Sequence, residues 1–155
     1  MTPAELLDHL AADGATLAFA ESLTGGLLTD AFVAVPGASR VLRGGIIAYA
    51  TELKASLLGV DPGLLAEFGA VDPVVAEQMA AGARERLEAT YGVSTTGVAG
   101  PDPQDGQPVG TVYIGVAGPA GTGHTRVQLH GDRAAIRAGA VEQAVATLAR
   151  TVGRA

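Results

Sequence analysis

A short apolar run that ends in a polar turn and two glycines constrains the fold of this chain more than any other stretch. Residues 15–20 are largely apolar, and the segment Glu21-Ser22-Leu23-Thr24-Gly25-Gly26 follows them directly. Apolar residues then recur at helical spacing as far as about Val35. The stretch therefore predicts a strand, a tight turn and the start of a helix.

Ser22 lies where the first backbone N–H groups of the predicted helix have no partner within the helix. Such groups bind anions, so a serine hydroxyl beside them suits a nucleophile and its developing oxyanion. We expect the N–H groups around Thr24, Gly25 and Gly26 to be these donors, and Glu21 to contact substrate. The alternative is that Ser22 or Thr24 caps the helix, while the glycines only allow close packing.

The rest of the chain repeats this alternation of strands and helices. Further strands are predicted at residues 41–50, 93–99, 109–117 and 125–130. Helix starts are predicted at a Thr2 capping box and at the caps Thr51, Asp61, Asp72 and Asp132. The run 41–50 suits burial on both faces, and its Gly44-Gly45 pair lets another group approach the backbone, so we expect Gly45 to contact substrate. The pattern predicts one α/β domain over residues 1–155, with a mixed sheet covered by helices on both faces.

Composition excludes several classes of function. The net charge of −6 argues against a general nucleic-acid binder or an anionic-membrane binder, since such proteins carry a basic face. The chain has no cysteine and its three histidines lack metal-ligand spacing, so we expect no metal and no cofactor. No run reaches membrane-spanning length and the first residues do not resemble a signal peptide, so we expect a soluble, cytoplasmic protein.

Lys54 is the second candidate for chemistry. It is predicted at the third position of a short helix capped by Thr51, where the positive end of the helix dipole lowers an amine's pKa, as burial also does. A neutral amine there can act as general base for a serine hydroxyl. Tyr49 ends the preceding predicted strand, so Tyr49 and Lys54 can bracket one pocket. The alternatives are a surface lysine and an ordinary tyrosine at a strand end.

Two other places offer contacts to a ligand. Thr96 and Gly97 lie near the carboxyl end of a predicted strand, where α/β sheets tend to bind ligands, although threonine is also a good strand former. Arg133 and Arg137 open the last helix four residues apart, so they can hold a phosphate together. The competing interpretation is a solvated arginine pair beside a plain Asp132 cap.

A series of short segments matches one known family along nearly the whole chain and in order. The segments are Ala20-Glu21-Ser22-Leu23-Thr24-Gly25-Gly26, Pro36-Gly37-Ala38-Ser39, Gly44-Gly45-Ile46-Ile47-Ala48-Tyr49, Lys54 with Leu58-Gly59-Val60, Gly69-Ala70-Val71, Thr96-Gly97-Val98-Ala99-Gly100-Pro101, Pro108-Val109-Gly110-Thr111-Val112, and Gly131-Asp132-Arg133 with Ile136-Arg137. In this combination they resemble the CinA C-terminal domain family, whose characterised members are nicotinamide mononucleotide deamidases. The family's N-terminal domain has no counterpart here, so we expect the stand-alone form.

The resemblance implies a three-layer α/β/α sandwich with a mixed, mostly parallel sheet. It implies that Ser22 is the nucleophile and Lys54 its base, with Tyr49 and Thr96 assisting in the same pocket. The implied reaction hydrolyses the carboxamide of nicotinamide mononucleotide to nicotinate mononucleotide and ammonia, in pyridine nucleotide (NAD) recycling. We therefore expect a small nucleotide as the partner, and the glycine-rich loops and apolar composition favour a homo-oligomer.

Two departures from the family pattern keep alternatives open. Leu23 stands where the serine motif usually has a small residue or cysteine, which narrows the pocket. Asp102-Pro103-Gln104 and Gln107 stand where the family commonly has a glycine pair and a lysine. The alternatives are a non-catalytic nucleotide-binding or partner-binding module, and a deamidase for another small amide.

Overall fold

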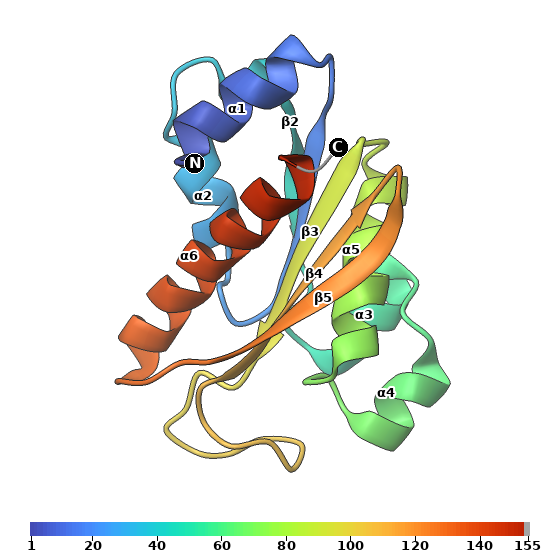
Figure 1. The fold of residues 1–155 in the computed structure, drawn as a ribbon. Helices are drawn as coiled ribbons and strands as arrows, with labels where there is room; N and C mark the ends of the chain where they lie inside the picture. The colour runs from blue at the N-terminus through green and yellow to red at the C-terminus, as the bar shows by residue number, and fades with distance from the viewer. Residues whose placement is uncertain (154–155) are drawn as a thin grey trace.

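The computed structural model describes residues 1–153, and within them one sheet of five strands forms the centre of the fold (Figure 1). The strands are β1 (Leu17–Glu21), β2 (Leu42–Ile47), β3 (Tyr91–Gly97), β4 (Thr111–Gly118) and β5 (Gly121–Gln128). Their order in the sheet is β2-β1-β3-β4-β5. β1 is parallel to β2 and β3, whereas β4 is antiparallel to β3 and β5. Only β4 therefore runs against the others, which confirms the mixed, mostly parallel sheet.

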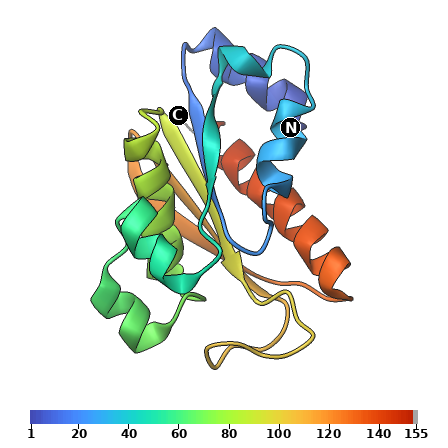
Figure 2. The ribbon, with the colours of Figure 1, turned by 180° about the vertical axis from the view of Figure 1, so that it is seen from behind.

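Helices cover both faces of this sheet, as the sequence predicts (Figures 1 and 2). One layer contains α1 (Pro3–Ala12), α2 (Leu27–Val33) and α6 (Arg133–Val152). The other contains α3 (Thr51–Leu58), α4 (Pro62–Phe68) and α5 (Pro73–Arg86). A short 3-10 helix, η1 (Ala38–Arg40), leads into β2. Among the helices in residues 1–153, none combines the length and the apolar character that crossing a membrane requires.

Strand β1 shows how the sequence builds these layers. Phe19 points to the layer of α1, α2 and α6, where its ring centroid lies 5.0 Å from that of Phe32. Ala20 faces the other layer, in the apolar cluster that includes α5. The backbone of α5 lies very close to the sheet, because a Cβ at Gly115 would be 2.1 Å from the Ala76 carbonyl oxygen. Small residues on this face thus bring α5 onto the sheet.

Helix ends follow most of the predicted capping residues. The Thr2 hydroxyl accepts the Glu5 N–H at 3.2 Å, and the Glu5 carboxylate accepts the Thr2 N–H at 2.7 Å, which forms the capping box. Further helices begin at the predicted N-caps Asp61, Asp72 and Asp132. The prediction is wrong at α3, where Ala50 is the N-cap without a side-chain bond and Thr51 is the first helical residue. Lys54 is consequently the fourth residue of α3.

Strand β2 also differs from its prediction. It was expected to be buried on both faces, but it lies at the edge of the sheet, and its side chains alternate between half-buried and exposed. Gly45 packs against α2, because a Cβ there would lie 2.2 Å from the Thr29 hydroxyl oxygen. The close approach to this glycine is therefore made by a helix. Gly45 does not line the cavity described below, so its predicted contact with substrate is not found.

Candidate active site

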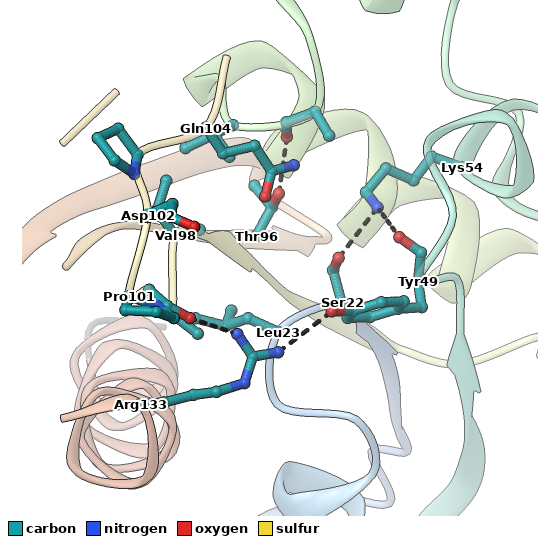
Figure 3. A pocket seen from close by; sticks show the side chains of 16 residues that line it. Ser22, Leu23, Tyr49, Lys54, Thr96, Val98, Pro101, Asp102, Gln104 and Arg133 are labelled. Atoms are coloured by element: carbon teal, nitrogen blue, oxygen red, sulfur yellow. Dashed lines mark hydrogen bonds between the residues drawn. The ribbon is translucent and has the colours of Figure 1, made fainter. Parts of the chain in front are cut away.

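The carboxyl ends of β1, β2 and β3 meet at one edge of the sheet, and a cavity of about 290 Å³ lies there (Figure 3). Ser22 enters it from the turn after β1, and Tyr49 and Lys54 from the segment after β2. Thr96 and Gly97 enter it from the end of β3. All the residues predicted to be catalytic thus line one cavity, as parallel strands that share a carboxyl edge allow.

The amine of Lys54 is buried, with only 1% of the residue exposed, and it has three polar neighbours. Nζ lies 3.0 Å from Ser22 Oγ, and it donates to the carbonyls of Ala48 at 2.8 Å and Tyr49 at 3.2 Å. Burial lowers the pKa of Lys54 to about 8, although two nearby carboxylates oppose the effect. A fraction of these amines is therefore uncharged near neutral pH.

Lys54 donates in all three contacts, as the three N–H groups of a charged amine allow, and loss of one proton leaves a lone pair in the same place. A neutral amine offers two N–H groups and one lone pair. When the two N–H groups bond to the carbonyls of Ala48 and Tyr49, the lone pair remains for the hydroxyl proton of Ser22. The geometry suits transfer of that proton from Ser22 to Lys54.

The turn after β1 fixes the place of Ser22. Its N–H donates to the Thr95 carbonyl at 3.1 Å, and its carbonyl accepts the N–H of Gly25 at 3.1 Å. Gly25 and Gly26 adopt left-handed φ angles of 55° and 105°, which favour glycine. Gly26 is the N-cap of α2, so the interpretation of Ser22 or Thr24 as a helix cap is wrong. The Thr24 hydroxyl lies 2.8 Å from that of Thr95, and its side chain does not line the cavity.

Glu21 does not reach the cavity, contrary to its predicted contact with substrate. Its side chain is fully buried, and its carboxylate accepts N–H groups of Gly26 at 3.1 Å, Leu28 at 2.9 Å and Thr29 at 2.9 Å. The Thr29 hydroxyl also donates to it, at 2.5 Å. These N–H groups lie at the start of α2, where a helix supplies no acceptors of its own. Glu21 therefore caps α2 from the preceding strand.

The expected oxyanion donors also change. The N–H of Gly25 donates to the Ser22 carbonyl, and the N–H of Gly26 donates to the carboxylate of Glu21. Within residues 1–153, the N–H groups of Leu23 and Thr24 have no hydrogen-bond acceptor. The free donors beside Ser22 thus precede the two glycines.

The two arginines at the start of α6 separate. Arg133 lines the cavity, where Nη1 donates to the Gly100 carbonyl at 2.6 Å and Nη2 donates to the Tyr49 hydroxyl at 3.2 Å (Figure 3). Arg137 donates instead to backbone carbonyls of residues 22–26, the serine turn. Its Nε donates to the Leu23 carbonyl at 2.9 Å, and its Nη2 donates to the Thr24 carbonyl at 3.2 Å. The prediction that both arginines form one phosphate site is wrong, because Arg133 lines the cavity and Arg137 does not.

Thr96 keeps its predicted place but has a partner within the protein. Its hydroxyl donates to the Ala70 carbonyl at 2.6 Å, and only 1% of the residue is exposed. The outer wall of the cavity includes Asp102 and Gln104 of the loop between β3 and β4, which the sequence analysis identified only as a departure from the family pattern. Sequence reasoning missed the carbonyls that hold Lys54, since backbone acceptors leave no signal in residue type. Within residues 1–153, no group of three or more His, Asp or Glu side chains is arranged to hold a metal ion.

Comparison with known proteins places this arrangement in a family. The model of the CinA C-terminal domain matches residues 2–152. A CinA-like protein of Frankia casuarinae is 59% identical over 140 residues, which cover 90% of this chain and 32% of that protein. The chain thus spans about a third of the length of the curated relatives it matches.

Solved structures agree with this assignment. A crystal structure of a competence-damaged protein (CinA) superfamily protein from Escherichia coli has a TM-score of 0.93 at 32% identity, covering 96% of this chain and 87% of that chain. A competence/damage inducible protein from Agrobacterium tumefaciens has a TM-score of 0.87 at 34% identity, and the match covers 96% of this chain and 94% of that protein's chain. The chain therefore belongs to the CinA C-terminal domain family.

Proposed function

We propose that this chain hydrolyses the carboxamide of nicotinamide mononucleotide, giving nicotinate mononucleotide and ammonia, with Ser22 as nucleophile and Lys54 as general base. The observation that carries the proposal is the 3.0 Å separation between the buried amine of Lys54 and the Ser22 hydroxyl, inside a cavity. A nucleophile that touches a base with a lowered pKa is typical of covalent amide hydrolysis.

In the first half of the reaction, neutral Lys54 takes the proton of Ser22, and Oγ attacks the carboxamide carbon. The negative charge that develops on the carboxamide oxygen lies beside the free N–H group of Leu23, which lines the cavity. The protonated Lys54 then gives its proton to the departing ammonia, and an ester to Ser22 remains. In the second half, Lys54 takes a proton from water, which attacks the ester carbon. As the bond from that carbon to Ser22 Oγ breaks, Lys54 returns the proton to Oγ, which releases nicotinate mononucleotide and restores both residues.

Arg133 is proposed to bind the ribose phosphate. Of the cationic side chains in residues 1–153, only Lys54 and Arg133 line the cavity, and Lys54 is committed to Ser22. The Tyr49 hydroxyl accepts from Arg133 at 3.2 Å and so holds the guanidinium at the cavity. Thr96 assists by binding the Ala70 carbonyl, which fixes the cavity wall beside Ser22.

The direct test measures ammonia release from nicotinamide mononucleotide by the wild-type chain and by Ser22→Ala. We expect release by the wild type and almost none by the variant. Ser39→Ala, an exposed serine of η1, is the matched control and should retain full activity. Equal rates for the wild type and Ser22→Ala would eliminate the mechanism.

The same samples separate the alternative functions. Calorimetric binding of nicotinate mononucleotide without turnover of the amide would favour a nucleotide-binding module over an enzyme. Release of ammonia from other small amides but not from the mononucleotide would keep the Ser22 and Lys54 chemistry and reject the substrate.

A further inference from the structure

We propose that Glu21 and Arg137 are positioning residues for the serine turn, residues 22–26: Glu21 binds Gly26 and the start of α2 that follows the turn, and Arg137 binds the carbonyls of the turn. The proposal rests on the proposed function, because it takes Ser22 as the nucleophile. Neither side chain lines the cavity. Each was expected at the substrate, and each instead binds the backbone that carries Ser22.

Glu21 holds the donor side of the turn. Its two carboxylate oxygens accept three N–H groups and one hydroxyl from residues 26–29, at distances between 2.5 and 3.1 Å. A fully buried carboxylate is stable only with such bonds, and four of them leave it no freedom to turn toward a ligand. Since Glu21 directly precedes Ser22, the start of α2 is tied to the residue next to the nucleophile.

Arg137 holds the acceptor side of the turn. It reaches from the second turn of α6 to the carbonyls of Leu23 and Thr24, at 2.9 and 3.2 Å. Two donors in the fixed fork of a guanidinium set the orientation of two successive peptide groups, which a single amine cannot do. The contact joins α6 to a turn more than a hundred residues earlier in the chain.

Arg137 also fixes the orientation of the peptide between Leu23 and Thr24. The carbonyl of Leu23 and the N–H of Thr24 belong to one planar trans peptide, so they point in opposite directions. When Arg137 binds the Leu23 carbonyl, the Thr24 N–H is turned away from Arg137 and has no acceptor within residues 1–153. Arg137 thus fixes the peptide that follows Leu23, close to Ser22, without lining the cavity.

The Glu21 half is tested with Glu21→Gln, which keeps the shape but replaces one acceptor oxygen with an amide that donates. Amide hydrogen exchange at Leu28 and Thr29, followed by NMR, should accelerate about 10-fold or more, since at least one N–H loses its acceptor. Asp30→Asn, an exposed acid in the same helix, is the matched control and should leave exchange unchanged. In the same variant kcat should fall about 10-fold while KM changes less than about 2-fold, which loss of a cap alone would not cause. Unchanged exchange or unchanged kcat in Glu21→Gln, or equal acceleration of exchange in Asp30→Asn, overturns this half.

The Arg137 half is tested with Arg137→Met and Arg137→Lys, because a half-buried site on a long helix tolerates both. We expect kcat to fall about 10-fold to 100-fold in Arg137→Met while KM changes less than about 2-fold, with partial recovery in Arg137→Lys. Arg150→Met, on the same helix, is the control. A rise in KM with unchanged kcat would instead make Arg137 a substrate contact and overturn the proposal.

The two proposals fail in different ways. If the wild-type chain does not release ammonia from nicotinamide mononucleotide, the proposed function fails. The positioning role is then decided by the exchange rates and by the amide chemical shifts of residues 23–25 in Arg137→Met, which need no substrate. Shifts that match the wild type would overturn it.

Discussion

The cavity has two walls that are built in different ways. The inner wall carries Ser22, Lys54 and Thr96, which are 8%, 1% and 1% exposed, and each polar head is bonded within the protein. The outer wall carries Asp102 and Gln104 on an exposed loop. The inner geometry is fixed by folding, before any ligand arrives, whereas the loop can change at little cost to the fold. With the proposed function, the chemistry belongs to the inner wall, and we expect the outer wall to affect only the binding of substrate.

The largest effect is expected from Lys54→Met on the inner wall. Methionine fills a similar volume but cannot take the Ser22 proton, so kcat for ammonia release should fall at least about 10³-fold. Steady-state kinetics on the folded variant, checked by circular dichroism, provide the measurement. If more than a tenth of the activity remains, Lys54 is not the base, and the inner wall does not carry the chemistry.

The pH dependence gives the next largest effect. In the proposed mechanism Lys54 acts in its uncharged form, and burial lowers its pKa to about 8, so kcat/KM should rise with pH and level off above that value. Between pH 8 and pH 6 the expected decline is about 50-fold, because protonated Lys54 accumulates. Asp105→Asn removes a carboxylate that raises this pKa, and should move the rising limb to lower pH. A profile that is flat from pH 6 to pH 8 contradicts a lysine base.

Arg133→Gln tests the proposed binding of phosphate by the arginine that lines the cavity. Loss of a charged contact to phosphate should raise KM about 10-fold, with a much smaller change in kcat. Arg126→Gln, an exposed arginine on β5, should leave both constants unchanged. A fall in kcat alone would move Arg133 from binding to chemistry.

The smallest effect is expected on the outer wall. Asp102→Asn removes a negative charge that lines the cavity and opposes an anionic substrate, so KM should fall about 2-fold with kcat unchanged. Measurement at two salt concentrations checks the cause, since screening should shrink the difference. A change in kcat of about 10-fold would break the division between the walls.

Local signals in the sequence were enough for most of the fold. Asp72 and the proline after it define the start of α5, because a capping carboxylate and a fixed φ act on neighbours in the chain. The edge position of β2 was not predictable, since an apolar run carries no information about whether a second strand pairs with it. Gly45 shows the same limit. The sequence predicts that another group packs against this glycine, but it does not predict that the group is the side chain of Thr29.

In the candidate site, too, the features set by neighbours in the chain were predictable, and those set by distant elements were not. Ser22 and Lys54 were located from their positions at a strand end and near a helix start, and the structure brings them together. Arg133 and Arg137 share one helix face, yet they reach different partners, which only the neighbouring elements decide. Glu21 was assigned to the substrate because it adjoins Ser22, whereas alternation along a strand directs adjacent side chains to opposite faces.

The buried amine that faces Ser22 also belongs to the sole lysine of the chain, since every other basic side chain apart from histidine is arginine. Incorporation of lysine labelled with nitrogen-15 only at Nζ would therefore yield a single resonance, free of overlap, from an atom inside the cavity. Its titration would follow the protonation of one chosen atom directly, and its displacement on adding a nucleotide would register occupancy without any mutation or chemical tag.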